Sequence, residues 1–170
     1  ELFPAEQWGR AIGYVADEVM LFPGSVAANI ARFDQGIDPE AVYRAAQEAG
    51  AHDMILELPK GYHSIVGDGS TILSAGQRQQ IALARALYGQ PKVLILDNPT
   101  AFLDPDGEER LSNTLKEARK RGAAILVVSR RNTILQVADR AFVLQNGAIG
   151  MLDIGRRPAP AAPATAPRIL

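Results

Sequence analysis

Two apolar runs on either side of a strongly marked helix constrain the fold of this chain more than any other feature. Residues 92–97 and 123–128 are continuous apolar runs bounded by polar residues, as expected for strands buried on both faces of a sheet. Between them, Asp104 and Pro105 suit the cap and first position of a helix, and a basic segment before Gly122 suits its end. A strand, a helix and a strand in this order predict a crossover between parallel strands, and hence an α/β fold.

Residues 23–88 carry a different pattern, with short helical segments and few strand signals. The clearest of these helices begins at an Asp38 cap and stops at Gly50. We interpret this stretch as a helical subdomain inserted between two parts of an α/β core, residues 1–22 and 89–152.

The C-terminal part of the chain contains a predicted hairpin and a tail. Short strands over residues 140–145 and 148–152 flank Asn146-Gly147, the strongest short hairpin signal. Residues 153–170 are rich in proline and alanine and have almost no large apolar residue, so we predict a disordered tail there. Because the sequence begins without Met or a signal segment, we expect it to be part of a longer protein.

Composition excludes several classes of function. Eighteen Lys and Arg against nineteen Asp and Glu give a net charge of −1, so no basic field predicts a nucleic-acid partner. The chain has no cysteine and two histidines, which excludes disulfides, thiolate metal sites and a His-rich metal centre. We expect His52 and His63 to have surface or structural roles. The apolar runs are far shorter than the roughly 20 residues of a membrane helix.

Residues 73–87 are the most informative segment. Ser74 is a good helix N-cap, and the small Ala75 and Gly76 after it allow another surface to approach the backbone. The free N–H groups and the positive dipole end of such a helix form a potential anion site. By composition alone, an ordinary capped helix without a ligand is the more common case.

A second candidate position follows in the strand of residues 93–97. Its last residue, Asp97, stands at the carboxyl end of a buried strand, where open α/β sheets place ligands. An aspartate there commonly holds Mg²⁺. Taken alone, the pattern also fits an aspartate that only caps the next turn.

Together, these two motifs resemble the signature helix and the second phosphate-site strand of the nucleotide-binding domain of ATP-binding cassette (ABC) transporters. Residues 12–15 and 21–30 resemble the glutamine-loop region of exporters. Residues 66–69 resemble the exporter loop that usually reads Gly-Glu-Gly and helps to couple the domain to membrane helices. The resemblance covers about residues 8–152 and is closest to the ATPases of exporters and of type I secretion.

The resemblance implies a partial RecA-like P-loop NTPase core of the ABC type with an inserted helical subdomain. It also implies ATP and Mg²⁺ as cofactors, and as partners a second ABC nucleotide-binding domain and the transmembrane domain of an exporter, at the cytoplasmic face of the inner or plasma membrane. In this family each ATP lies between the phosphate loop of one domain and the signature helix of the other. By this resemblance, Ser74, Ala75, Gly76 and Gln77 contact nucleotide, Asp97 binds Mg²⁺ and Asp104 belongs to the dimer-facing loop.

The sequence departs from the family at the catalytic positions. None of its four lysines follows a glycine, so the phosphate loop Gly-x-x-x-x-Gly-Lys-Ser/Thr is absent, and we expect it upstream. Asp17 stands where the family has the loop glutamine, Asn98 where it has the catalytic glutamate, and Arg130 where it has the switch histidine. An amide cannot act as a general base, whose loss costs about 10²–10⁴-fold in rate. We therefore predict weak or no ATPase activity for this chain alone.

Other interpretations stay open. Asn98 also fits a simple turn opener, because Asn-Pro is common in that role. A vestigial or interaction-only protein without a nucleotide role is an alternative. A chromosome-maintenance or repair ATPase has similar motifs, but the loop at 67–69 and the short helical insertion argue against it. If the strand that leads into the phosphate loop is missing, exposed apolar faces should make the chain alone less stable or promote pairing with another chain.

Overall fold

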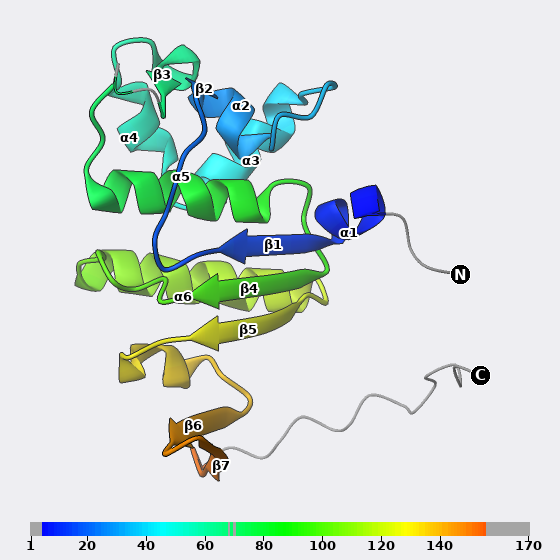
Figure 1. The fold of residues 1–170 in the computed structure, drawn as a ribbon, viewed down its shortest axis with the longest axis vertical. Coiled ribbons are helices and arrows are strands. Elements are labelled where there is room, and N and C mark those ends of the chain that lie inside the picture. The colour runs from blue at the N-terminus through cyan, green and yellow to red at the C-terminus, as the bar shows by residue number, and fades with distance from the viewer. Residues whose placement is uncertain (1–4, 68, 70, 156–170) are drawn as a thin grey trace. The chain divides into compact units, whose positions relative to one another are not determined.

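The computed structural model describes residues 5–67, 69 and 71–155 (Figure 1). These residues form two units, one up to Arg131 and one from Asn132 onward, and each is described by itself. Most of the predicted tail, residues 156–170, lies outside the described residues, as does Asp68 of the predicted coupling loop. The division at residue 152 therefore stays a prediction.

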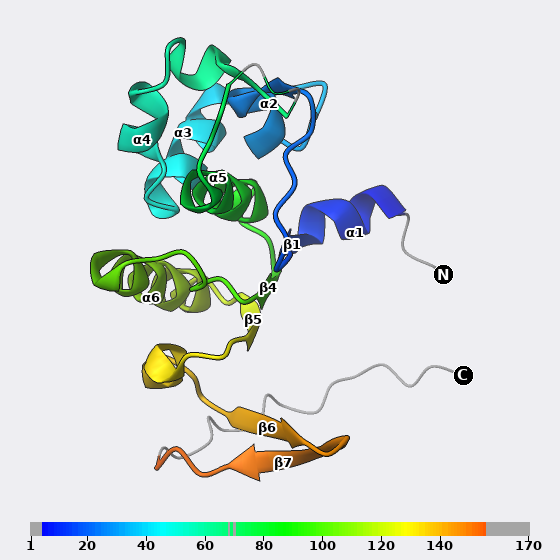
Figure 2. The same ribbon diagram turned by 60° about the vertical axis from the view of Figure 1, so that its left-hand side comes forward.

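The first unit is built on a three-stranded sheet in the order β1 (Ile12–Val15), β4 (Val93–Asp97) and β5 (Ala124–Val128). All three strands are parallel. Helix α6 (Pro105–Lys120) connects β4 to β5 and is capped by Asp104, which confirms the predicted crossover. Helices α5 (Ala75–Leu87) and α6 lie on the same side of the sheet (Figure 2).

Among the described residues, helices cover only one face of this sheet well. Val15, Leu94 and Leu96 point towards the helices and are almost fully buried. On the opposite face, the side chains of Tyr14 and Leu126 are 55% and 59% exposed. The prediction that both strands of the crossover are buried on both faces is therefore wrong for β5, because α5 and α6 pack on one side only.

The inserted segment is helical, as predicted. It contains α2 (Val26–Ile30), α3 (Pro39–Glu48), α4 (His52–Leu56), the 3₁₀ turn η1 (Gly61–His63), and a short antiparallel pair formed by β2 (Gly24–Ser25) and β3 (Ile65–Val66). A further helix, α1 (Ala5–Ala11), precedes β1. Asp38 caps α3, with Pro39 at its first position. These capping residues explain why the helix boundaries could be predicted.

His52 has a structural contact within this helical segment. Its Nδ1 lies 2.9 Å from the hydroxyl of Tyr62. Burial, followed by the nearby Tyr43 and Asp53, raises the pKa of Tyr62 to about 12. The phenol therefore stays protonated at neutral pH and joins α4 to η1, which agrees with the expected structural role of His52.

Arg32 links the helical segment to the sheet. Its guanidinium donates hydrogen bonds to the carbonyls of Ile12 (3.0 Å), Arg85 (2.9 Å) and Ala86 (2.9 Å), and it also contacts those of Gly9 and Tyr88. Burial lowers the pKa of this guanidinium, and the neighbouring charge of Arg85 lowers it further. One side chain thus satisfies carbonyls at the end of α5, where a cation also interacts favourably with the helix dipole.

The second unit contains a 3₁₀ turn and a hairpin. The turn η2 spans Asn132–Gln136, and β6 (Ala141–Gln145) pairs antiparallel with β7 (Ala148–Leu152). Asn146 and Gly147 have φ values of 49° and 77°, the left-handed conformation that a two-residue hairpin turn requires. This confirms the predicted hairpin. In neither unit is a described helix long and apolar enough to span a membrane.

Replacing Arg32 tests its role as the link. We expect Arg32→Met to lower the free energy of unfolding by about 2–4 kcal/mol, because several part-buried carbonyls lose a charged donor. Arg32→Lys keeps the charge but has no planar fork of donors, so it should recover less than half of that loss. Urea denaturation followed by circular dichroism measures both. Equal stability of Arg32→Met and the wild type would contradict the assignment.

Candidate functional site

The parallel strands bring predicted catalytic positions to one edge of the sheet. Asp17 follows β1, Asp97 ends β4 and is followed by Asn98, and Arg130 follows β5. The Asn98 side-chain amide donates a 2.9 Å hydrogen bond from Nδ2 to Oδ1 of Asp17, although the two residues are 81 positions apart. The structure therefore places in direct contact the two residues that we predict at the positions of the loop glutamine and the catalytic glutamate.

Asn98 is held by its backbone as well as by its side chain. Its N–H donates to the Val128 carbonyl on β5 (2.7 Å). Its carbonyl accepts from Nε2 of Gln79 (3.3 Å) and from the N–H of Ala101 (3.1 Å). Its φ is 50°, a left-handed conformation that asparagine tolerates better than most residues. The turn itself therefore gives a reason for asparagine at this position.

Asp97 and Arg130 make fewer contacts. Within the described residues, neither side chain has a hydrogen bond or ion pair. The adjacent Arg131, by contrast, forms an ion pair with Glu108 on α6. Arg130 is exposed at the same sheet edge as Asn98, so it remains accessible to an anion from outside the unit.

The amino end of α5 is exposed and self-capped. The Ser74 hydroxyl accepts from the Gln77 N–H (3.2 Å), and the Gln77 side chain accepts from the Ser74 N–H (2.9 Å). Helix geometry leaves the N–H groups of Ala75 and Gly76 without an intrahelical acceptor. Arg78 folds back so that its Nη1 donates to the Leu73 carbonyl (2.6 Å), which adds a positive charge near the helix dipole. This end of α5 is therefore suited to an anion.

The loop after Asn98 crosses the first turn of α5 and leads into α6. A Cβ atom at Gly76 would lie 3.5 Å from the Phe102 carbonyl oxygen, an ordinary contact distance. At the end of the loop, Asp104 accepts from the Gly107 N–H (2.7 Å). Asp104 thus caps α6, whereas its role in a dimer-facing loop stays a prediction.

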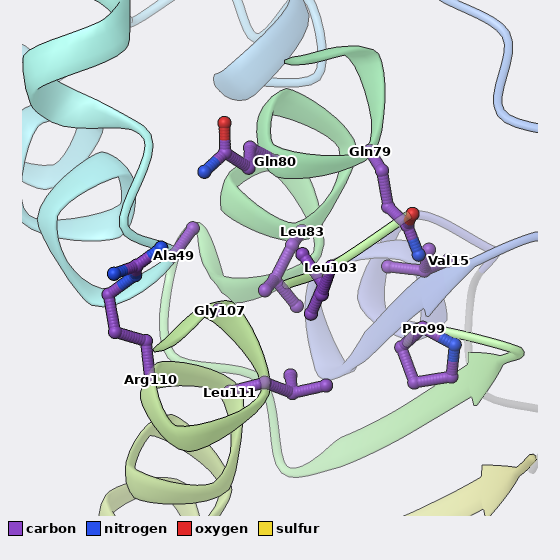
Figure 3. A pocket seen from close by; sticks show the side chains of 10 residues that line it. All are labelled: Val15, Ala49, Gln79, Gln80, Leu83, Pro99, Leu103, Gly107, Arg110 and Leu111. Atoms are coloured by element: carbon purple, nitrogen blue, oxygen red, sulfur yellow. The ribbon is translucent and has the colours of Figure 1, made fainter. Parts of the chain in front are cut away.

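A small recess lies beneath this loop, between α5, α6 and β1. Its cavity volume is only about 20 Å³, and its mainly apolar walls include Val15, Leu83 and Leu111. Figure 3 shows the Gln79 side chain reaching from α5 towards Val15. Gln79 is 5% exposed, and its Oε1 has no hydrogen-bond partner among the described residues. The sequence analysis missed Gln79, although a glutamine on the buried face of an amphipathic helix is a recognisable signal.

Asp97 is the residue at the sheet edge that would hold a magnesium ion shared with phosphate. Asp97 offers carboxylate oxygens without a described partner, and oxygen is the ligand that Mg²⁺ prefers. The described residues contain no group of three or more His, Cys, Asp or Glu side chains that could hold a metal ion. An ion at Asp97 would therefore depend on water and phosphate for its remaining ligands.

Comparisons with known proteins agree with this arrangement. Residues 3–101 match the sequence profile of the ABC transporter family. The type I secretion system ATP-binding protein PrsD of Rhizobium meliloti is 43% identical over 147 residues, which cover 84% of this chain and 25% of that protein.

Two further relatives are similar to this chain at nearly the same level of identity. The ATP-dependent lipid A-core flippase of Saccharophagus degradans is 41% identical over 138 residues, covering 81% of this chain and 23% of the flippase. The alpha-hemolysin translocation ATP-binding protein HlyB of Proteus vulgaris is 40% identical over 140 residues, covering 82% and 20% respectively. The chain thus spans a quarter or less of the length of these curated relatives.

Two glycines in helix N-terminal turns should respond differently to substitution by alanine. A Cβ atom at Gly107 would lie 2.9 Å from Oδ1 of Asp104 and 3.2 Å from Cβ of Leu103, so Gly107→Ala should disturb the α6 cap and cost about 1 kcal/mol. Gly76→Ala meets only ordinary contacts and should change stability by less than about 0.5 kcal/mol. Thermal denaturation of both variants checks this, and equal losses would contradict the described loop geometry.

Proposed function

Because the chain belongs to the ABC transporter family, we propose that it acts as a nucleotide-binding domain of an exporter or secretion transporter. Its contribution is the amino end of α5, which binds the terminal phosphate of an ATP molecule held by a second ABC domain. The relatives named above for secretion and translocation support the exporter assignment. A membrane partner and a position at the cytoplasmic face of the membrane follow from the same proposal.

The observation that carries the proposal is the exposed, positively polarised end of α5. Ser74 is exposed, and the N–H groups of Ala75 and Gly76 point along the helix axis without intrahelical acceptors. Arg78 adds a full positive charge close by. Donors that are already in place cost no reorganisation when a phosphate binds, so they stabilise its negative charge efficiently.

The residues at the sheet edge support ATP and Mg²⁺ as cofactors but favour slow hydrolysis. Mg²⁺ would be held by Asp97, and it neutralises charge on the phosphates when bound. Asn98 cannot accept a proton as a carboxylate does, and Arg130 can contact a phosphate but cannot relay a proton. The printed sequence contains no phosphate loop. With an amide at position 98 and an arginine at position 130, we expect this chain alone to have little ATPase activity.

Contacts behind the site suggest how it communicates with a membrane partner. A Cβ atom at Gly67 would lie 2.5 Å from the carbonyl oxygen of Phe22, so the loop after β3 packs closely on the segment that follows Asp17. The rings of Phe22 and Phe33 meet edge to face, with their centroids 6.2 Å apart, and the two residues are 59% and 46% exposed. This surface is the proposed contact for the transmembrane domain.

Two substitutions of Ser74 test the phosphate contact. Both Asn and Asp are good helix N-caps and have nearly the same shape, so both variants should fold normally. Ser74→Asp places a negative charge where the phosphate binds, and it should weaken ATP-dependent association with an intact ABC nucleotide-binding domain by more than about tenfold. Ser74→Asn is the matched neutral control and should weaken it much less.

Analytical ultracentrifugation with ATP, with ADP and without nucleotide measures this association. The intact partner domain should carry a phosphate loop and be blocked in hydrolysis, so that ATP persists. A complex that forms only with ATP and is lost in Ser74→Asp supports the proposal. Absence of any ATP-dependent complex, or equal binding of both variants, would favour the interaction-only alternative.

A further inference from the structure

The hydrogen bond between Asp17 and Asn98 is part of a continuous series of contacts that ends on α5. Asp17 Oδ1 accepts from Asn98 Nδ2 at 2.9 Å, and the Asn98 carbonyl accepts from Gln79 Nε2 at 3.3 Å. Gln79 belongs to the buried face of α5, in the turn after Ser74. We propose that Asp17 and Asn98 are positioning residues that fix the amino end of α5 without nucleotide in this chain. This inference rests on the proposed function.

The link between Asn98 and α5 is sensitive to small displacements. The Gln79 side chain is 5% exposed, and its Oε1 lacks a partner among the described residues. The bond to the Asn98 carbonyl is therefore the one described hydrogen bond of a buried amide. Losing it would leave a second buried polar group unsatisfied, which is strongly unfavourable. The position of α5 is thereby coupled to that of Asn98.

Asn98 is fixed in turn by its surroundings. Its N–H is bonded to β5, and its left-handed backbone conformation restricts the residue types that fit there. The contact with Asp17 adds an attachment to the loop after β1. The pair therefore joins the carboxyl ends of β1 and β4, so that the sheet edge is held by the chain's own side chains.

The donor and the acceptor of the hydrogen bond between Asp17 and Asn98 can be exchanged by substitution. An amide donates and a carboxylate accepts in the present bond, and an amide at 17 with a carboxylate at 98 would form the same bond in the opposite sense. Asparagine and aspartate both tolerate the left-handed conformation at position 98. Two carboxylates, in contrast, would repel each other across this distance. The single substitution Asn98→Asp should therefore break the hydrogen bond between positions 17 and 98, which we call the 17–98 clamp. Adding Asp17→Asn should restore this clamp.

The experiment compares Asn98→Asp with the reversed pair Asp17→Asn/Asn98→Asp in the 170-residue chain. We expect Asn98→Asp to lower the melting temperature by about 3 °C and to weaken ATP-dependent association with the intact ABC domain at least about threefold. The reversed pair should restore both quantities. Asn113→Asp is the matched control, because Asn113 is exposed on α6 and its side chain accepts a single described hydrogen bond, from Lys116.

A third variant separates positioning from stability. Gln79→Leu removes the link to α5 and the unsatisfied Oε1 together, so stability should fall little, whereas association should still weaken at least about threefold. If Asn98→Asp and Gln79→Leu both associate normally while Ser74→Asp is still impaired, the positioning role of Asp17 and Asn98 is wrong but the proposed function stands. Failure of the reversed pair to rescue association would overturn this positioning role as well. If Ser74→Asp also binds normally, the proposed function itself is wrong.

Discussion

The parallel pairing of β1 with β4 is the constraint on which the site depends. Its register sets Val15 opposite Leu96, so the residues that follow each strand, Asp17 and Asn98, meet at the same sheet edge. Gly13 in β1 allows α5 to lie directly on this pair, because a Cβ atom there would lie 2.1 Å from the Ala86 carbonyl oxygen. The strand register and the close approach of α5 together fix the amino end of α5 relative to the carboxyl ends of β1 and β4.

At this site, binding and hydrolysis depend on different groups. In the proposed function, phosphate binding uses the backbone N–H groups at the amino end of α5, its capping box and the charge of Arg78. Proton transfer depends on side-chain chemistry at the sheet edge, where this chain has an amide and an arginine at the positions that we predict to be catalytic. We therefore propose that the chain can complete a partner's nucleotide site even if its own hydrolysis is slow.

Local signals predicted the elements that are fixed by local physics. Asp38 and Asp104 mark helix starts because their side chains bond to backbone N–H groups a few residues away, and Asn146-Gly147 marks a turn through its own backbone preference. The contacts of Arg32 and the bond between Asp17 and Asn98 were not predicted, because each joins segments distant in sequence. The exposed face at Leu126 was missed for the same reason: an apolar run does not indicate what covers it.

In the proposed function, the amino end of α5 binds a phosphate carried by another subunit. Hydrogen–deuterium exchange of the Ala75 and Gly76 amides reports on this directly, because both N–H groups lack intrahelical acceptors and should exchange quickly in the free chain. With an ATP-loaded ABC domain present, the account predicts much slower exchange at these two amides than with the ADP-loaded domain. Equally fast exchange in both cases, at concentrations where the two proteins associate, would contradict it.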